Sequence, residues 1–371
     1  MHSDTELRSP RTRLGISAIA LSLVAIVAAC GGSSATPAPA TEAPATAAPA
    51  TAAPATEAPT AAAVAALGFS QAHLSDPFQQ VLLEQLQAQT TAQGATWAGA
   101  ANANDDPAKQ VTDMSTLISK GATALLIAPV DAQAIIPAID AATAANVPVV
   151  SIDQAPAGGK VAMVVRADNL KMGVTACEEM GKLLGGEGTV LELQGALSSA
   201  NGLQRSQGFG DCMKSNFPNI KIEQVATDWS MEKATTSAQT ILSTKDIKGI
   251  YWASDFFFPG IQKVLQDLDK WKKVGEDGHV AIVGIDGTAE ALQAIRDGYQ
   301  DATVSQPLDL YAKFGVMYAA GAAAGQTWSD GPTDHNSTIV TTDGIPADNL
   351  TAPLVTSENV DDPTLWSNMV K

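Results

Sequence analysis

The stretch TVLELQGALSSANGLQRSQGF, residues 189–209, decides the fold of this chain. It begins with a short apolar run between Gly188 and Gly195, which predicts a buried strand that enters a loop. Capping-type residues then precede Leu203, so a helix is expected to open there. Arg205 therefore lies in the first turns of a helix that follows a strand, and in an open α/β sheet that position faces the ligand crevice. An arginine there offers five donors to an oxygen-rich ligand, although a solvated helix residue is the commoner case.

Strands alternate with helical segments on both sides of this stretch. We expect one series of strands near 64–72, 95–101, 123–128, 147–152 and 161–165, and a second near 189–194, 220–227, 248–253, 280–285 and 301–305. This alternation predicts parallel sheets with helices on both faces, and two series predict two α/β lobes. The sequence contains no Rossmann fingerprint, Walker loop or GxSxG elbow, and its four histidines lack metal-ligand spacing. We therefore expect no cofactor and no metal site.

The first 62 residues have the composition of a leader and a linker. Three arginines precede an apolar run over 14–29, which is typical of an export signal. That run is about 16 residues long, whereas a membrane span needs about 20. Residues 30–62 are rich in Ala, Pro and Thr, with too much proline for helix or sheet, so we expect a disordered tether there.

Composition excludes one class of partner and leaves a question about the cysteines. The 371 residues, of which 45% are hydrophobic, suffice for two domains with their own cores. The formal net charge is −17, and such a surface opposes nucleic-acid binding, whose affinity comes chiefly from phosphate neutralisation. An exported compartment permits a disulfide between Cys177 and Cys212, with free buried cysteines as the alternative.

The ordered motifs of the chain resemble those of a known family. The string ELQG at 192–195, followed ten residues later by the R-x-x-G-F of 205–209, resembles the ribose/galactose branch of the type I periplasmic sugar-binding proteins. The resemblance continues through DPF at Asp76, LLIAPVD at Leu125, VPVVSID at Val147 and VGIDGT at Val283, and covers roughly residues 64–340. It implies the type I fold, in which a three-strand hinge joins two doubly wound parallel-sheet lobes.

The resemblance also implies lobe boundaries and an anchor. Three crossings between lobes are expected, near 166–168, 305–307 and 335–340. The first lobe would comprise 64–166 plus 307–337, and the second 167–306 plus 338–371. The leader ends in Val27-Ala28-Ala29-Cys30, which resembles a bacterial lipobox. Residues 1–29 would then be a lipoprotein signal peptide and Cys30 the lipidated residue, with an uncleaved anchor as the alternative.

Polar or aromatic side chains recur just past the predicted strands. The candidate ligand-binding residues are Asp76, Phe78, Gln79, Asp153, Gln154, Arg205, Trp229, Ser254, Asp255, Asp286 and Gln306. Singly, such residues are more often caps or turn formers. Together they fit a site where carboxylates accept hydroxyl hydrogens, an arginine donates, and rings cover the C–H face of the ligand.

Four positions depart from the family pattern. Ala128 and Ser254 stand where the family commonly has Asn, Gln154 where an Arg follows the Asp, and Gln79 where a second Phe stacks. These changes argue against ribose itself and favour another pentose, a hexose or a polyol. The run at 256–258, Phe-Phe-Phe, could supply an aromatic face or could pack in the core.

The function that the resemblance implies is binding without turnover. A monomeric, lipid-anchored solute-binding protein on the outer face of the cell membrane (periplasm or cell surface) would close two lobes over a sugar or polyol and deliver it to the permease subunits of an ABC importer. The alternatives are a ligand-binding component of a chemosensory or signalling receptor, and a binder of a non-sugar small solute. A glycosidase with paired carboxylates is opposed by the two-lobed resemblance, and a DNA-reading repressor by the leader and the net charge.

Overall fold

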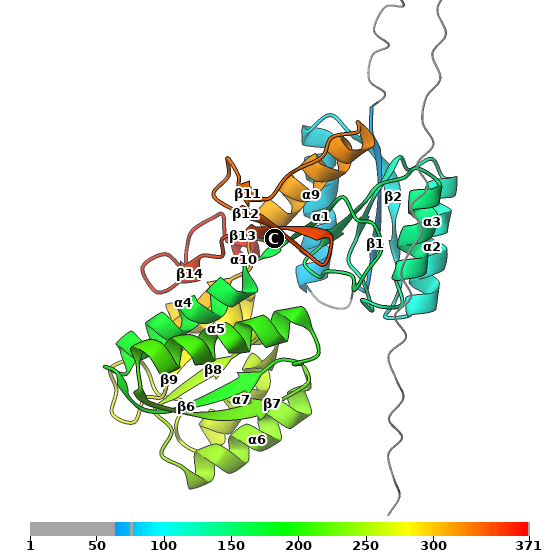
Figure 1. Cartoon of the computed structure of the whole chain (residues 1–371). Helices are drawn as coiled ribbons and strands as arrows, with labels where there is room; N and C mark the ends of the chain where they lie inside the picture. Colours follow the sequence, from blue (N-terminus) through cyan, green and yellow to red (C-terminus); the bar gives the residue numbers. More distant parts are fainter. Residues whose placement is uncertain (1–63, 75–76, 370–371) are drawn as a thin grey trace, which may run out of the picture. The chain divides into compact units, whose positions relative to one another are not determined.

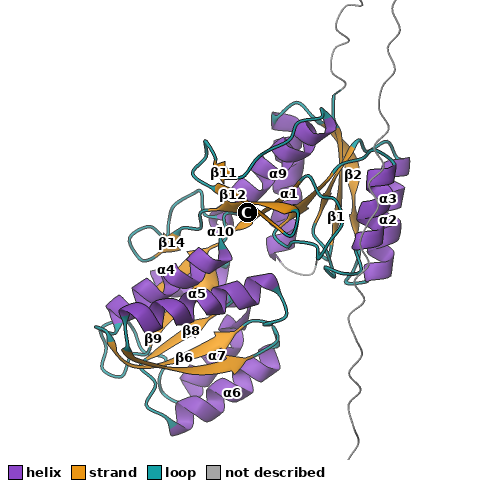
Figure 2. Ribbon diagram, in the orientation of Figure 1, coloured by secondary structure: helices purple, strands orange, loops and turns teal. Residues whose placement is uncertain are grey.

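The chain folds around two separate sheets that are covered by helices on both faces (Figure 2). A computed structural model describes residues 64–74 and 77–369. The expected signal peptide, tether, Cys30 and Asp76 lie outside these residues. In the described part, no helix has the length and apolar character needed to cross a membrane. The α/β class with two parallel-sheet lobes is confirmed.

The first lobe is built on an eight-stranded sheet with the order β11-β12-β13-β5-β4-β3-β1-β2. Its strands are β1 Ala66–Gln71, β2 Thr96–Asn102, β3 Ala124–Ile127, β4 Val149–Ile152, β5 Met163–Ala167, β11 Gly331–Pro332, β12 Thr338–Thr342 and β13 Ile345–Leu350. Its helices are α1 Pro77–Ala92, α2 Pro107–Ser119, α3 Ile136–Ala144 and α9 Leu308–Ala323. Helices α1 and α9 pack together on one face, and α2 and α3 on the other (Figure 1).

The second lobe is built on a six-stranded sheet with the order β14-β10-β9-β8-β6-β7. Its strands are β6 Glu187–Gln194, β7 Asn219–Ala226, β8 Gly249–Trp252, β9 Ala281–Asp286, β10 Ala302–Ser305 and β14 Leu354–Val355. Its helices are α4 Asn169–Leu183, α5 Ala200–Asn216, α6 Met231–Thr244, α7 Phe258–Asp267, α8 Ala289–Arg296 and α10 Trp366–Met369, with a 3₁₀ turn, η1, at Asp255–Phe257. All ten predicted strands are present, within two residues or so of their expected bounds.

Local sequence explains where several helices begin. The side chains of Asp106, Asp168, Ser199, Ser230 and Thr288 each accept a hydrogen bond from a backbone N–H in the first turn of the helix that follows. The cap at residue 199 confirms the predicted start of the helix that carries the R-x-x-G-F motif. Of the strands that precede these helices, β5, β6 and β9 are largely buried, as parallel strands covered on both faces should be, whereas β2 and β7 lie at the sheet edges and are more exposed.

Helices α4 and α5 approach each other unusually closely. A Cβ at Gly173 would lie 2.1 Å from the backbone oxygen of Arg205, and one at Gly208 would lie 2.1 Å from the oxygen of Leu170. Only glycine at these two positions lets the backbones touch. One helical turn beyond Gly173, Cys177 forms a disulfide with a cysteine of α5, Cys212, with a Cα–Cα distance of 6.2 Å. The pairing that the sequence left open is therefore present in the structure.

The third crossing between the sheets differs from the expectation. The first two follow β5 and β10, as predicted, but the third follows β13 at Leu350 and not residues 335–340. Residues 338–350, expected in the second lobe, form two strands of the first, because β13 pairs in parallel with β5. The turn between β12 and β13 is Asp343-Gly344, with φ of 52° and 80°. Asp-Gly between two strands is a strong signal for a β-hairpin. The expected lobe boundary followed the family resemblance instead, and it therefore placed this hairpin in the wrong lobe.

Candidate functional site

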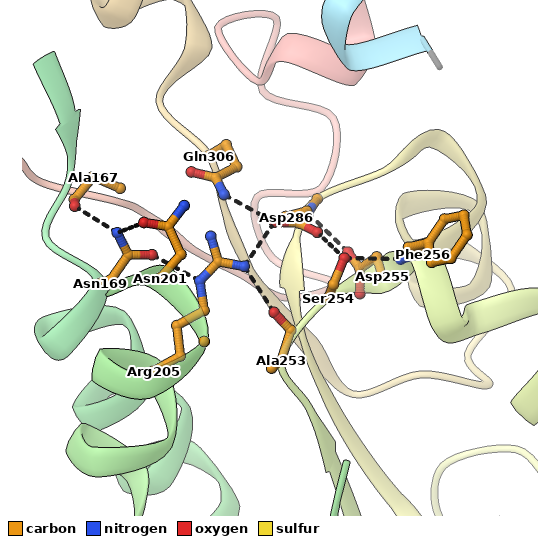
Figure 3. Close-up of polar contacts among 12 residues, drawn as sticks. Ala167, Asn169, Asn201, Arg205, Ala253, Ser254, Asp255, Phe256, Asp286 and Gln306 are labelled. Carbon is orange, nitrogen blue, oxygen red and sulfur yellow. Dashed lines mark hydrogen bonds and ion pairs between the residues drawn. The ribbon is translucent and has the colours of Figure 1, made fainter. Parts of the chain in front are cut away.

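Arg205 is buried at the N-terminal end of α5, with 3% of its surface exposed. Its Nε donates to Oδ1 of Asn169 at 2.7 Å, and its Nη1 donates to the backbone oxygen of Ala253 at 2.7 Å. The same Nη1 lies 3.3 Å from Oδ1 of Asp286 (Figure 3). The arginine is therefore bound by a side chain of α4 and by groups at the ends of β8 and β9. It is buried, so it is not the solvated helix residue that is the commoner case.

Asp286 is the acidic partner, and it receives donors from three directions. It is the last residue of β9, with a φ of 118° that is rare outside glycine. Its Oδ1 also accepts from Nε2 of Gln306 at 2.9 Å, and its Oδ2 accepts from Oγ of Ser254 at 2.5 Å. About a fifth of its side chain (18%) remains exposed. The structure thus brings together four of the predicted site residues, from four separate segments of the chain.

A closed ring of hydrogen bonds connects these residues to both of the first two crossings. Oε1 of Gln306 accepts from the hydroxyl of Tyr311 at 2.8 Å, and that hydroxyl accepts from the backbone N–H of Ala167 at 2.8 Å. The oxygen of Ala167 accepts from Nδ2 of Asn169 at 3.1 Å, and the amide oxygen of Asn169 binds the arginine. We call this ring, with Arg205 and Asp286, the Arg205 network.

Asp153 lies beside this network at the end of β4. It adopts a φ of 65°, and its Oδ1 lies 3.5 Å from Nδ2 of Asn201. Burial raises the pKa of Asp153, while the positive charges of Arg205 and Arg166 oppose that rise. Arg166, at the first crossing, donates to the side-chain oxygen of Gln204. A second carboxylate and two amide side chains therefore border the network.

Aromatic rings stand at two places near the predicted site. Phe78, at the start of α1, meets Tyr311 edge-on with centroids 6.4 Å apart, and Trp366 of α10 edge-on at 5.7 Å. Trp229 stacks on Phe257 at 6.5 Å, and a Cβ at Gly195 would collide with its ring. The indole of Trp229 therefore fills space above the end of β6 that glycine leaves free.

Asp255 has a different role from the expected one. The residue is 2% exposed, and its carboxylate accepts from Nε1 of Trp252 at 2.7 Å, the N–H of Gly287 at 2.8 Å, the N–H of Thr288 at 3.3 Å and Oγ1 of Thr303 at 2.9 Å. Three of these donors bind Oδ2 and one binds Oδ1, and the burial of the residue keeps the carboxylate away from solvent. Asp255 supports the turn that carries Asp286, because η1 directs its side chain into the lobe.

The other predicted residues differ in their exposure to solvent. Gln154 is exposed, and Gln79 is buried within α1. Within the triple-phenylalanine run, Phe257 and Phe258 are buried in the core of the second lobe, as the core-packing alternative expected. Phe256 is 57% exposed and points away from Arg205 (Figure 3).

Sequence reasoning missed several members of the site. Asn169 and Asn201 stand in the first turns of α4 and α5, where capping-type residues are common and a network role leaves no distinct signal. Tyr311 lies in an apolar helix and is indistinguishable there from a core residue. Trp366 comes from a segment beyond the motifs. Its position depends on tertiary packing alone.

The assembled groups favour a neutral, hydroxyl-rich ligand. Two carboxylates can accept hydroxyl hydrogens, the arginine can donate, and four amide side chains can donate and accept. Positive and negative charges are balanced across Arg205, Arg166, Asp153 and Asp286, so a strongly charged ligand would upset the balance. In the described part of the chain, no group of three or more His, Cys, Asp or Glu side chains could hold a metal ion.

Comparison with known proteins assigns the family. The sequence pattern of the periplasmic binding protein domain matches residues 67–327. The chain belongs to the periplasmic binding protein family. Among its relatives is the ribose import binding protein of Bacillus subtilis, which is 30% identical over 257 residues, covering 68% of this chain and 80% of the relative. The xylitol-binding protein of Mycolicibacterium smegmatis is 28% identical over 200 residues, covering 53% and 55%.

Solved structures of periplasmic binding proteins share the fold. An ABC transporter solute-binding protein from Mycobacterium smegmatis with bound glycerol is 30% identical to this chain. The two align with a TM-score of 0.66, over 80% of this chain and 96% of the other. A ribose ABC transporter protein from Conexibacter woesei aligns with a TM-score of 0.69 over 81% and 94%, at 20% identity, which shows the fold alone.

Proposed function

We propose that this periplasmic binding protein binds a sugar or polyol of the pentose to hexose class and delivers it to an ABC importer by closing its lobes over the ligand. The observation that carries the proposal is the Arg205 network, which sets a buried arginine against a partly exposed carboxylate at the carboxyl ends of β8 and β9. In open α/β sheets that edge is where ligands bind. The ribose, xylitol and glycerol named for the relatives share the polyhydroxylated chemistry that such groups recognise.

The side chains also narrow the ligand within that class. The hydroxyl of Ser254 is already bonded to Oδ2 of Asp286, and Gln154 is exposed. Neither supplies the cationic or amide donor that the family usually has at these positions. The site therefore depends more on acceptors than a ribose site does, and we expect it to prefer a ligand with several hydroxyl donors, such as a polyol.

A thermal-shift screen of the purified protein across pentoses, hexoses and polyols tests the function. A ligand that binds only the native state raises the melting temperature. Calorimetric titration of each hit then gives Kd, and product analysis of the same mixtures checks that the ligand is unchanged. If pentoses, hexoses and polyols all leave the melting temperature unchanged while a non-sugar solute raises it, the proposed ligand class is wrong.

Variants of the network then test the site. Asp286→Ala and Arg205→Ala should weaken binding by about 2 to 5 kcal/mol, because each leaves a buried polar partner unpaired. Arg205→Lys should not restore affinity, because one ammonium cannot reproduce the donor fork. The arginine variants should also lower stability, since Asn169 and Ala253 lose their donors. Asp113→Ala, which breaks an ion pair with Lys109 on α2, is the matched control. Equal affinity in the control and network variants would place the site elsewhere.

We also propose that the mature protein is a monomer held at the outer face of the membrane by a lipid on Cys30. The support is the apolar leader that ends in Val27-Ala28-Ala29-Cys30 and the proline-rich tether behind it. At about 3.1 Å per residue in polyproline II, a tether of about 30 residues could span roughly 90 Å. Cys30→Ser should move the protein from the membrane fraction to the soluble one. Retention of the variant on membranes would mean that the leader itself is the anchor.

A further inference from the structure

The chain continues past the third crossing into a segment that returns to the site. Strand β14 pairs antiparallel with β10, and residues 356–369 follow it, ending in α10. We call residues 356–369 the C-terminal strap. The family model matches residues 67–327, so the strap follows the matched part of the chain.

The strap is attached to α8, the helix that follows the turn at Asp286. Arg296 of α8 donates to Asp361 at 2.7 Å, to the backbone oxygen of Val360 at 3.1 Å and to Asn368 at 2.8 Å. A small apolar cluster supports the same attachment: it joins Leu292 and Ile295 of α8 to Val355, Val360 and Leu365. The strap is therefore held to the second lobe without any help from its tryptophan.

Trp366 uses its polar atom on the site itself. Its Nε1 donates to the backbone oxygen of Asp286 at 2.7 Å, and Oγ of Ser367 donates to the oxygen of Gly287 at 2.5 Å. Both acceptor residues have positive φ, 118° and 73°. A non-glycine residue in this region persists only where its surroundings fix it. The strap supplies part of that fixation from one side, and Asp255 supplies the rest from the other.

The ring of Trp366 contacts the first lobe. It meets Phe78 edge-on, with centroids 5.7 Å apart and an interplanar angle of 85°. Phe78 also meets Tyr311 of the Arg205 network at 81°. Two edge-on contacts restrict the plane of the Phe78 ring. One indole thus touches both the turn that carries the acidic group and the ring predicted to cover the ligand.

We propose that Trp366 is a positioning residue of the ligand site, which fixes the Asp286 turn and the Phe78 ring at the same time. The inference rests on the proposed function, because it assigns Trp366 to the site that would hold the sugar or polyol. A buried tryptophan needs an acceptor for its N–H, and here that acceptor is the backbone oxygen of Asp286, while the ring contacts Phe78. The strap thereby adds a component to the site from beyond the residues that the family model matches.

Two variants separate the contacts of Trp366. Trp366→Phe keeps a ring against Phe78 and removes the N–H donor, whereas Trp366→Ala removes both. The control is Trp328→Phe, because Trp328 meets Tyr318 edge-on at 4.7 Å in the first lobe and is partly buried. The first readout needs no ligand: it is hydrogen exchange of the backbone amides at 287–290. The second is Kd for the sugar or polyol that the screen identifies.

We expect faster exchange at 287–290 in both Trp366 variants and wild-type exchange in the control. Trp366→Phe should raise Kd by about three- to tenfold, the equivalent of one lost hydrogen bond, and Trp366→Ala should raise it further. Wild-type exchange in both variants, or equal acceleration in the control, would overturn the proposal. So would a Kd within twofold of wild type in both variants. If the wild-type protein binds no sugar or polyol, the proposed function fails, and exchange alone decides whether Trp366 positions the turn.

Discussion

Asp255 is buried behind the turn that carries Asp286 and binds two backbone N–H groups of that turn. Burial and the neighbouring carboxylate of Asp286 raise the pKa of Asp255 to about 7. Hydrogen bonds from Trp252, Thr303 and the N–H of Gly287 oppose that rise. The folded state therefore holds a proton on this group more tightly than the unfolded chain does.

The raised pKa predicts a dependence of stability on pH. The contribution of Asp255 is fully present below the ordinary pKa near 3.8 and is lost as the pH rises through about 7. Between pH 4 and pH 8, the free energy of unfolding of the wild type should fall relative to that of Asp255→Asn by up to about 4 kcal/mol. Urea unfolding at four pH values measures this difference. Glu84→Gln, an exposed residue of α1, is the control. Parallel curves for wild type and Asp255→Asn would contradict the prediction.

The sequence predicts the place of a site residue when that place depends only on the end of a strand. Arg205, Asp286, Ser254 and Gln306 follow strands or open helices, and parallel strands bring such positions to one edge. Asp255 follows a strand too, but a single 3₁₀ turn reverses its side chain. A direction set by one local turn cannot be inferred from spacing.

Among the elements, the pair α4 and α5 does most to place the arginine. The close approach at Gly173 and Gly208 puts Asn169 of one helix within 2.7 Å of Arg205 of the other. The disulfide then fixes the same pair further along. The glycine of the R-x-x-G-F motif thus has a physical reason, because any side chain there would push the two helices apart.

The disulfide should contribute measurably to stability. It closes a loop of 35 residues, for which the chain-entropy estimate is about 3 to 4 kcal/mol. We expect Cys177→Ser/Cys212→Ser to lower the free energy of unfolding by about that amount, and wild type in reductant to match it. Thiol labelling of denatured protein should find two more thiols per chain after reduction than before. Equal thiol counts would show that both cysteines are free.

Elements of regular βα alternation were predictable, whereas the shortest elements after them were not. Each of the ten predicted strands is an apolar run bounded by turn residues, so its type follows from local pattern. Strands β11 and β14 have two residues each, and α10 has four. Elements this short carry no periodicity, and only their tertiary partners define them.

For the molecule as a whole, Tyr311 is the residue that connects the first two crossings. Its hydroxyl accepts from Ala167 at the first crossing and donates to Gln306 at the second. Phenol chemistry suits this position, since one oxygen can donate and accept together. If the two crossing segments moved relative to each other, one of these two hydrogen bonds would have to break or rearrange.

Tyr311→Phe should therefore affect both stability and binding. It leaves the buried N–H of Ala167 and the amide oxygen of Gln306 without their partner, at a cost of about 1 to 3 kcal/mol for each group. Because Gln306 also donates to Asp286, ligand affinity should fall. Tyr318→Phe on the same helix removes a buried hydroxyl that donates to Asp348. It should lower stability and keep wild-type Kd. Calorimetry and urea unfolding of both variants give the comparison, and unchanged affinity in Tyr311→Phe would contradict it.

The parallel pairing of β13 with β5 has a consequence for how the chain acquires its structure in time. Ala347 pairs with Val164, about 180 residues earlier, so the contact is of high order and slow to form. Strands β6 to β10 of the second lobe are contiguous in the chain and can assemble without waiting for the tail. As the chain emerges from its N-terminal end, the edge of β5 stays unpaired until almost the last residues arrive. The first lobe therefore cannot complete its sheet until the end of the chain is available.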